Sequence, residues 1–288
     1  MKQLLISLLS LVSIFASAQT SNLRVGSYNL WISTIGKGDY TWELRRERLA
    51  NSIVDLNMDI FSVQEVDTRI QEELPLLLKE RGADYSFWYF SPYSQDGKGT
   101  KAHGIAYRTS RFELLETHYF WYSETPKIMS SGWDEMKFKR GGCCAIVLDK
   151  ENGEKFFFVS THGPLGKEAR AHGAKILNKY AKKYNKKKLP AFMAGDLNAK
   201  PEDPATATYK TYWTDSFLVL PEDKKEGPTG TFNGHDINRD MENSARIDYV
   251  YYRSKKITPV KYVCDTTKYN GLWASDHCPV YVDFEIKY

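Results

Sequence analysis

The stretch AFMAGDLNAKP, residues 191–201, carries a short apolar run into Gly195 and Asp196, then Asn198, and ends at Pro201. An apolar run followed by Gly, Asp, Asn and Pro is typical of a buried strand that ends in a turn. Side chains alternate along a strand, which predicts that Asp196 and Asn198 point the same way from its end. A carboxylate and a carboxamide side by side bind a cation, orient a water molecule or cap a turn. The rest of the sequence has to decide among these roles.

The first residues have the composition of a secretory signal. Lys2 precedes an apolar run from Leu4 to Ala16, and the small residues Ala16-Ser17-Ala18 precede Gln19. This apolar run is too short to cross a bilayer. We therefore expect a cleavable signal peptide over residues 1–18, cut near Ala18-Gln19, and a secreted or periplasmic protein.

Residues 19–288 are enough for one large domain or two small ones. We find no low-complexity linker among them, and the turn ENGE at residues 151–154 predicts a tight hairpin between two strand-like runs. We therefore expect a single domain, and we expect it to be a monomer.

The net charge of the chain is weakly positive. It is +4 for the whole sequence, and the loss of Lys2 with the signal peptide would leave +3. This balance permits a polyanionic partner without requiring one. The densest basic run, KKYNKKK at residues 182–188, ends a helix-like segment, so we interpret it as a solvated helix end whose cations suit the helix dipole.

Four cysteines in an exported protein raise the question of disulfides. Cys143 and Cys144 are adjacent in an apparent strand and would point to opposite faces. Cys264 and Cys278 lie in two late strand-like runs. We interpret most of the four as small buried residues and keep a Cys264–Cys278 bridge as a minor alternative.

Short strand-like runs dominate the sequence, and three helix-like segments interrupt them. The strand-like runs are residues 23–31, 59–66, 86–90, 103–108, 112–122, 143–150, 155–163, 189–198, 246–253 and 279–286. The helix-like segments are residues 41–57, 70–82 and 167–184. This alternation predicts an α+β fold in which β-sheets pack together with helices outside.

Six of the apolar runs carry a polar group at or near one end. These groups are Asn29, Glu65, His162, Asp196 with Asn198, Asp248, and the triplet Ser275-Asp276-His277. Burying such groups without partners costs a few kcal/mol each, so their recurrence predicts a shared cleft. Oxygen ligands without a Cys–His cage suit Mg²⁺, Mn²⁺ or Ca²⁺, and imidazoles serve as proton donors or acceptors. Neither a GxSxG elbow nor a P-loop is present, and a hard metal, an acid that activates water and nearby imidazoles are the parts that hydrolysis of a phosphoester needs.

The ordered motifs SYN, QE, STH, GDLN, RIDYV and SDH resemble the endonuclease/exonuclease/phosphatase superfamily, whose members include DNase I. The resemblance runs from residue 27 to residue 284, and the segment FWYSETP…SGWD…R is similar to an exported bacterial branch. It implies a DNase I-like four-layer fold of two packed, mostly antiparallel sheets flanked by helices.

The same resemblance implies a role for each residue of the set. Glu65, Asn29 and Asp276 would bind the metal. Asp196 would orient or deprotonate the attacking water, and Asn198 would hold a phosphate oxygen. His277, paired with Asp248, would stabilise the transition state. His162 would donate to the phosphate or the leaving oxygen, and Arg140 would bind phosphate.

The sequence also departs from the pattern of the superfamily at two places. Where relatives carry an acidic residue that supports the histidine equivalent to His162, this chain has Lys101-Ala102-His103. Where many relatives read THLD, it reads THGP at residues 161–164. These departures leave open the partner of His162 and motivate an alternative from another class, a catalytically silent protein that binds phosphates or glycans.

The substrate remains open among several phosphoesters. A nuclease or phosphodiesterase is the first interpretation, and a phosphomonoesterase or a lipid or inositol phosphate hydrolase uses the same residues. A duplex-DNA enzyme would carry a wide basic stripe, and here the charge excess is slight. Residues 123–140 form the expected specificity loop. Trp121, Tyr122 and Trp133 are either core residues or stacking surfaces, whereas His118, His172 and His235 match no motif.

Overall fold

Two mixed β-sheets pack face to face at the centre of the structure, a computed structural model that describes residues 20–288. The expected signal peptide, residues 1–18, lies outside the described residues. One sheet has the order β10 (Lys225–Glu226), β12 (Ile257–Cys264), β13 (Val280–Lys287), β1 (Thr20–Asn29), β2 (Ile60–Val66), β4 (Ala102–Arg108) and β3 (Tyr85–Phe90). The other has the order β5 (Phe112–Trp121), β6 (Gly141–Asp149), β7 (Lys155–His162), β8 (Ala191–Asp196), β11 (Asp248–Arg253) and β9 (Thr214–Asp215).

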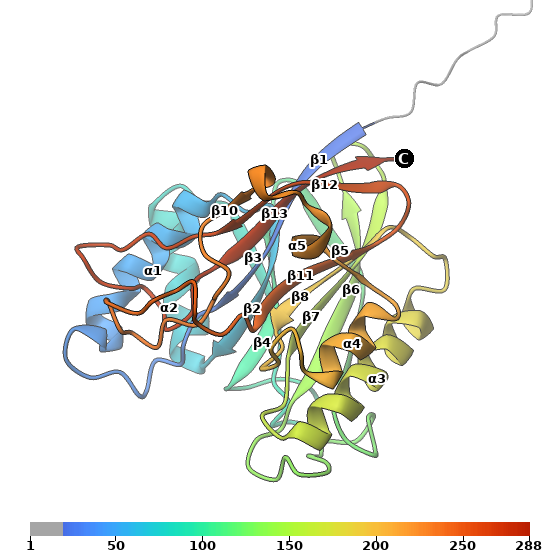
Figure 1. Cartoon of the computed structure of the whole chain (residues 1–288), viewed down its shortest axis with the longest axis horizontal. Helices are drawn as coiled ribbons and strands as arrows, with labels where there is room; N and C mark the ends of the chain where they lie inside the picture. The colour runs from blue at the N-terminus through green and yellow to red at the C-terminus, as the bar shows by residue number, and fades with distance from the viewer. Residues whose placement is uncertain (1–19) are drawn as a thin grey trace, which may run out of the picture.

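Helices cover the outer face of each sheet, which completes a four-layer arrangement (Figure 1). Helices α1 (Trp42–Leu56) and α2 (Thr68–Glu80) lie against the first sheet, and α3 (Lys167–Tyr184) and α4 (Pro204–Lys210) lie against the second. A short α5 (Ser216–Val219) contacts β11 and β12. Two 3₁₀ turns occupy Gly38–Tyr40 and Glu222–Lys224. The predicted α/β sandwich is confirmed.

Three apolar clusters hold these layers together. The central one lies between the sheets and includes Val25, Phe158, Phe192 and Val282. A second joins α1 and α2 to the first sheet, and a third joins α3 and α4 to the second. Trp121 and Tyr122 are core residues, each 1% exposed, which decides the alternative left open for them. None of the helices within residues 20–288 is long and apolar enough to span a bilayer.

Every predicted strand and helix is present, but some elements were not predicted. Strand β12 was missed because Pro259 and a bulge between Pro259 and Lys261 interrupt its alternation. Helix α4 was missed although its signal is readable, because Asp203 caps it by accepting from the Ala205 amide and Pro204 stands at its first turn. The predicted hairpin at residues 151–154 joins antiparallel β6 and β7.

All four cysteines are buried free thiols, as most were predicted to be. The Cys264–Cys278 bridge, kept as a minor alternative, is not formed. The two thiols nevertheless lie close together, since a hydrogen bond with Cys278 is the largest cause of the raised pKa of Cys264.

The topology brings several strand ends to one edge. β1 pairs with β2 in parallel, and β7 pairs with β8 in parallel, so Asn29, His162 and Asp196 all stand at carboxyl ends of strands. β11 runs antiparallel to β8, which places Asp248 opposite Asp196. Six sequence-distant segments therefore deliver their polar groups to one place.

Candidate active site

A hollow of about 560 Å³ opens at this edge of the two sheets. We call it the catalytic hollow. Its lining includes seven of the nine predicted site residues, namely Glu65, Arg140, His162, Asp196, Asn198, Asp276 and His277. The other two, Asn29 and Asp248, are fully buried and make hydrogen bonds to the lining residues. The structure thus brings together the whole predicted set.

Glu65 reaches the hollow because of a β-bulge. The pairing of β2 with β4 shifts between Val63 and Val66, so Gln64 and Glu65 together face one residue of β4. Val63 and Val66 both pack in the helix-facing cluster although they are three residues apart. Glu65 itself has a left-handed backbone, with a φ of 58°. The bulge turns this carboxylate out of the strand alternation and into the site.

Asn29 lies between the two halves of the site. Its Nδ2 donates to Asp196 Oδ2 at 3.1 Å and to Glu65 Oε1 at 3.4 Å. Its Oδ1 accepts from the Trp31 amide at 3.0 Å. In this orientation Asn29 bridges the end of β1 to two carboxylates of the site.

Glu65 and Asp276 fit a divalent cation. Both line the catalytic hollow, and the pKa of Asp276 is raised to about 6, mainly by burial and partly by the nearby charges of Glu65 and Asp196, against the effect of His277. A buried carboxyl beside a second carboxylate is neutralised well by a hard ion with oxygen ligands. The donor set on this side therefore suits Mg²⁺, Mn²⁺ or Ca²⁺.

Asp196, Asp248 and His277 also form a compact group of potential ligand atoms. Hydrogen bonds already occupy this group. His277 Nδ1 donates to Asp248 Oδ2 at 2.8 Å, and Thr231 Oγ1 donates to the same oxygen at 2.6 Å. A cation on Asp248 Oδ2 would leave His277 and Thr231 unpaired, although Asp248 Oδ1 has no partner among the described residues, and on this count the metal fits the Glu65 side better.

His277 is held as an imidazolium by this arrangement. Burial lowers its pKa, but Asp248 and the other carboxylates raise it more, so the pKa of His277 lies well above its usual value. Its Nε2 lies 3.9 Å from Asp196 Oδ2. Burial in turn raises the pKa of Asp248, against the effect of His277. The result is a fixed cationic donor that points into the hollow.

Asp196 stays ionised in this surrounding. Burial raises its pKa, but the hydrogen bond from His162 and the charge of His277 outweigh burial, so the pKa of Asp196 lies below its usual value. Its Oδ1 accepts from the Asn198 amide at 2.8 Å, and its Oδ2 lies 3.4 Å from His162 Nε2. A carboxylate aligned on both oxygens is well placed to orient a water molecule.

Arg140 is the partner of His162 that the sequence left open. Arg140 donates from a guanidinium nitrogen to His162 Nδ1 at 3.1 Å. Because Nδ1 accepts, Nε2 carries the proton and donates toward Asp196. Lys101 and the buried His103 stand where relatives were expected to carry an acid, and His103 remains neutral because burial lowers its pKa. An arginine therefore orients His162 in place of a carboxylate.

Asn198 lines the hollow, but not for the reason predicted from strand alternation. Strand β8 ends at Asp196, and Asn198 has a φ of 49°. Its Nδ2 donates to the Gly163 carbonyl at 3.0 Å. The shared direction of Asp196 and Asn198 therefore comes from the turn after β8 and not from the period of the strand.

Several residues that support the site were not predicted from the sequence. Arg45 of α1 is buried, donates to the Leu30 carbonyl at 2.8 Å and contacts the Trp31 carbonyl, which fixes the loop after β1. Thr231 supports Asp248. Nothing in the neighbourhood of either residue marks it, because its partner lies far away in the sequence.

The expected specificity loop, residues 123–140, contacts both the hollow and the start of α3. Phe138 and Arg140 line the hollow. Glu135 accepts from the Leu165 amide at 2.7 Å, and Asp134 accepts from the Ala169 amide at 2.8 Å. Trp133 is half-buried and stacks on His172 at a centroid distance of 4.5 Å. This aromatic pair lies outside the lining of the hollow.

A second hollow of about 330 Å³ adjoins the first. Asn198 and Ile247 line both, and Arg170 and Lys200 line only the second. The surface therefore continues on both sides of Asn198.

Comparisons with known proteins support this picture. The sequence profile of the Endonuclease/Exonuclease/phosphatase family matches residues 20–277. A crystal structure of an endonuclease/exonuclease/phosphatase family protein from Bacteroides thetaiotaomicron is 28% identical, with a TM-score of 0.82 over 94% of this chain and 100% of that one. A mannosyl-6-phosphatase of Bacteroides thetaiotaomicron is 28% identical, with a TM-score of 0.79 over 91% of this chain and 99% of that one. An uncharacterised protein of Acanthamoeba polyphaga mimivirus is 25% identical over 260 residues, which are 85% of this chain and 93% of that one.

Proposed function

The chain belongs to the endonuclease/exonuclease/phosphatase family and is a metal-dependent phosphoester hydrolase, and from this premise we propose that it is a phosphodiesterase. The observation that carries the proposal is the pair of adjoining hollows. A phosphodiester extends on both sides of its phosphorus, and the surface continues on both sides of Asn198. Glu202 and Asp203 also line the second hollow, and Arg170 pairs with Asp203 at 2.9 Å, so Lys200 is the lining cation left to meet a neighbouring phosphate.

The proposed metal ligands are Glu65 and Asp276, with Asn29 holding Glu65 in place. When bound, the cation would polarise the phosphate and neutralise its developing charge. The residues themselves position that phosphate. Arg140 and Asn198 line the catalytic hollow as donors for the phosphate oxygens, and the Asn198 amide has a second N–H besides the one bonded to the Gly163 carbonyl.

The proposed reaction is an attack of water on phosphorus. Asp196 accepts a proton from the water, whose oxygen forms a bond to phosphorus, and the bond from phosphorus to the leaving oxygen breaks. The His277 imidazolium, fixed by Asp248, stabilises the charge that develops on the phosphate oxygens. His162 exchanges its 3.4 Å contact with Asp196 for a hydrogen bond from Nε2 to the phosphate or to the leaving oxygen, and the leaving oxygen takes its proton from solvent.

A phosphomonoesterase is the second candidate. The similarity to a mannosyl-6-phosphatase over 91% of the chain favours it. So do the apolar walls of the catalytic hollow, where Tyr93, Phe138 and Leu165 would enclose one small leaving group.

A substrate panel separates these functions. Purified protein is assayed with Mg²⁺, Mn²⁺ or Ca²⁺ on an activated phosphodiester, single-stranded DNA, RNA, sphingomyelin, inositol phosphates and sugar phosphates. A phosphodiesterase cleaves the diesters, and EDTA stops the reaction. Release of inorganic phosphate from monoesters alone would establish the second candidate. Metal-independent turnover would contradict the proposed chemistry, and no turnover on any phosphoester would favour the silent binding protein.

The place of action is proposed from the sequence alone. The composition of residues 1–18 supports export to the periplasm or the medium, with residues 19–288 as one catalytic domain. Mass spectrometry of the protein from a cell fraction measures its first residue, and a chain that still begins at Met1 would contradict cleavage.

A further inference from the structure

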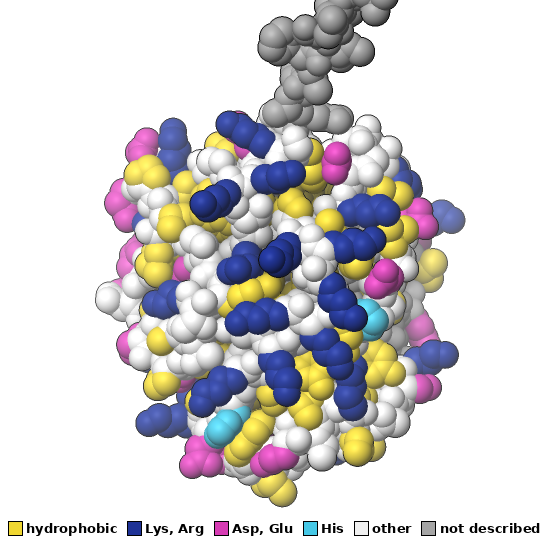
Figure 2. Space-filling model, turned by 90° about the vertical axis from the view of Figure 1, so that its right-hand side faces the viewer, with side chains coloured by type: hydrophobic (Ala, Val, Ile, Leu, Met, Phe, Trp, Pro, Cys, Tyr) yellow, Lys and Arg dark blue, Asp and Glu magenta, His cyan; other side chains and the backbone are white. Residues whose placement is uncertain are grey.

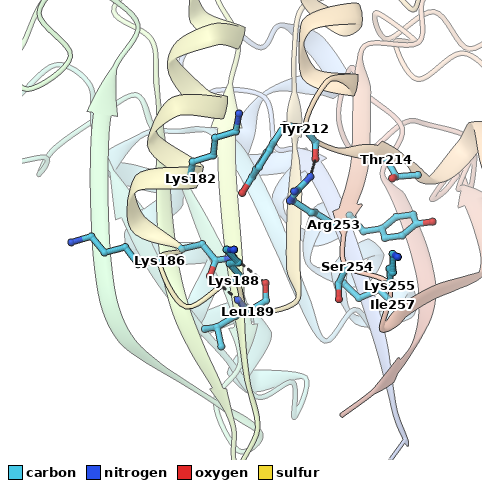
Figure 3. Close-up of a pocket in the computed structure, with 12 residues that line it drawn as sticks. Lys182, Lys186, Lys188, Leu189, Tyr212, Thr214, Arg253, Ser254, Lys255 and Ile257 are labelled. Atoms are coloured by element: carbon cyan, nitrogen blue, oxygen red, sulfur yellow. Dashed lines mark hydrogen bonds between the residues drawn. The ribbon is translucent and has the colours of Figure 1, made fainter.

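A groove of about 790 Å³ lies at the opposite end of the second sheet from the catalytic hollow. We call it the distal groove. Its lining includes Lys182 in the last turn of α3, Lys188 after α3, Tyr212 after α4, Arg253 at the end of β11 and Lys255 after it. Figure 3 shows Tyr212 between Lys182 and Arg253, with Lys255 beyond them and Lys186 extending away. Arg253 donates to the Tyr212 carbonyl at 2.6 Å, which fixes this arrangement.

The cations of the distal groove have no acidic partners. None of its twelve lining residues is Asp or Glu, and no ion pair within residues 20–288 involves Lys182, Lys186, Lys188, Arg253 or Lys255. All five are exposed. Three chain segments that are far apart in the sequence thus bring uncompensated positive charge to one concave surface. A solvated helix end accounts for the lysines after α3 but not for Arg253 and Lys255.

The basic charge of the protein is concentrated on this side. Residues 169–195 contain eight of the 40 Lys and Arg and none of the 36 Asp and Glu. The rest of the chain therefore has a formal charge of −4. Figure 2 shows Lys and Arg covering the face that carries α3 and α4. A mild average charge therefore conceals a strongly positive face.

Helix α3 connects the distal groove to the catalytic hollow. Leu165, just before α3, lines the hollow, and Asn185, just after it, lines the groove. Eighteen residues of helix span about 27 Å. Between the ends, Lys175, Lys179 and Lys182 recur at spacings of four and three, which places them on one exposed face. This row of charges follows the direction from one cavity to the other.

The shape and the charge together favour a flexible polyphosphate chain. A concave surface lined by point charges accepts a strand, whereas a flat membrane would contact ridges and would gain from exposed apolar side chains, which the groove lining lacks. The lining does not present an ordered set of donors and acceptors that could recognise particular bases. The ring of Tyr212 is already flanked by Lys182 at 4.9 Å and Arg253 at 4.0 Å. Binding would thus depend on the backbone and not on the base sequence.

We propose that the distal groove and the lysine row of α3 bind the phosphate backbone of a single-stranded nucleic acid. This inference rests on the proposed phosphodiesterase function, because it names the substrate class of that same hydrolase. The strand would follow α3, with its scissile phosphate in the catalytic hollow.

The test measures binding separately from catalysis. Fluorescence anisotropy with a labelled oligothymidylate of about 20 nucleotides is recorded in EDTA, so that no turnover occurs. The variant Lys182→Ala/Lys255→Ala is compared with the matched control Lys79→Ala/Lys287→Ala, which removes the same charge from exposed lysines elsewhere. We expect the groove variant to bind roughly tenfold more weakly and to reduce the salt slope by about 1.4, since each phosphate contact contributes about 0.7. The control should bind like the wild type.

Each contrary outcome overturns the inference. Equal weakening in both variants would mean that only net charge matters, and no binding by the wild type would remove the groove as a nucleic-acid site. Anionic phospholipid vesicles are measured in parallel, and loss of vesicle binding alone in the groove variant would assign the surface to a membrane. Hydrolysis of an activated small diester is assayed on the wild type, so failure of the groove and failure of the phosphodiesterase proposal give different results.

Discussion

The catalytic hollow and the distal groove use charge in opposite ways. In the hollow, carboxylates and imidazoles are buried and bonded to one another, as in the chain from Thr231 through Asp248 to His277. In the groove, cations are exposed and have no acidic partner within residues 20–288. Buried and paired groups have fixed positions, as a catalytic reaction requires. Exposed and unpaired cations can move to meet the phosphates of a polyanion. The region with fixed groups and the region with exposed cations thus lie about one helix length apart, at the two ends of α3.

The largest expected effect comes from the centre of the paired region. His277→Ala should lower kcat by about 10²–10⁴ and change KM little, because the imidazolium acts mainly in the transition state. Asp196→Asn should be comparably severe, since an amide cannot take the proton of water. Asp248→Asn should weaken the same step less, because the imidazole remains but is poorly oriented. Steady-state kinetics on an activated phosphodiester measures all three, with circular dichroism as the check on folding, and a folded His277→Ala enzyme with wild-type kcat would place the chemistry elsewhere.

The second prediction concerns the proposed metal ligand Glu65 in the catalytic hollow. Glu65→Gln should reduce activity by about a hundredfold or more at low metal concentration. Mg²⁺ should raise the melting temperature of the wild type, because it binds only the folded state, and should raise that of Glu65→Gln much less. Chelation by EDTA should reverse the shift. An undiminished shift in the variant would move the metal away from Glu65, for example toward Asp196 and Asp248.

Arg140 shares a feature with each region. It is a cation, like the residues of the groove, but it lines the catalytic hollow and its guanidinium is hydrogen-bonded to the imidazole of His162. Arg140→Gln should reduce kcat/KM roughly tenfold to a hundredfold, because the variant loses a phosphate donor and releases His162. Arg140→Lys keeps the charge but not the planar fork, so it should recover only part of the loss. Full recovery by lysine would show that Arg140 contributes charge alone and does not orient His162.

The smallest effect is expected on the stability of the unpaired region. Lys182→Ala/Lys255→Ala should change the free energy of unfolding by less than about 0.5 kcal/mol, since neither ammonium group has an acidic partner to lose. Urea denaturation measures the change, with Lys79→Ala/Lys287→Ala as the reference. A marked loss of stability would mean that the groove lysines hold the fold together and are not free for a ligand.

The sequence predicted the catalytic side well and the distal side poorly. The residues of the hollow follow apolar runs that signal strands, so the ends of β7 and β8 could be located from local patterns. The groove has no such local signal. KKYNKKK was interpreted as a solvated helix end because Arg253 and Lys255, which turn the lysines into a groove, lie more than sixty residues away.

Within the hollow, the sequence predicted residue identities better than contacts. Arg140 and His162 were both named, but their direct bond was not foreseen, since it depends on how the loop before β6 meets the end of β7. Asn29 was expected to bind metal, and its hydrogen bonds to Asp196 and from the Trp31 amide were not foreseen. Such details follow from three-dimensional packing and leave no trace in spacing.

The left-handed backbone of Glu65 has a consequence for engineering this protein. A non-glycine residue in that conformation costs on the order of 1 kcal/mol, so glycine at position 65 would relax the bulge and lose the carboxylate. Selection for thermal tolerance alone would therefore tend to replace the residue that we propose as a metal ligand. Libraries of this chain screened for heat resistance should hold position 65 fixed, because there the most durable scaffold and the most active enzyme are different proteins.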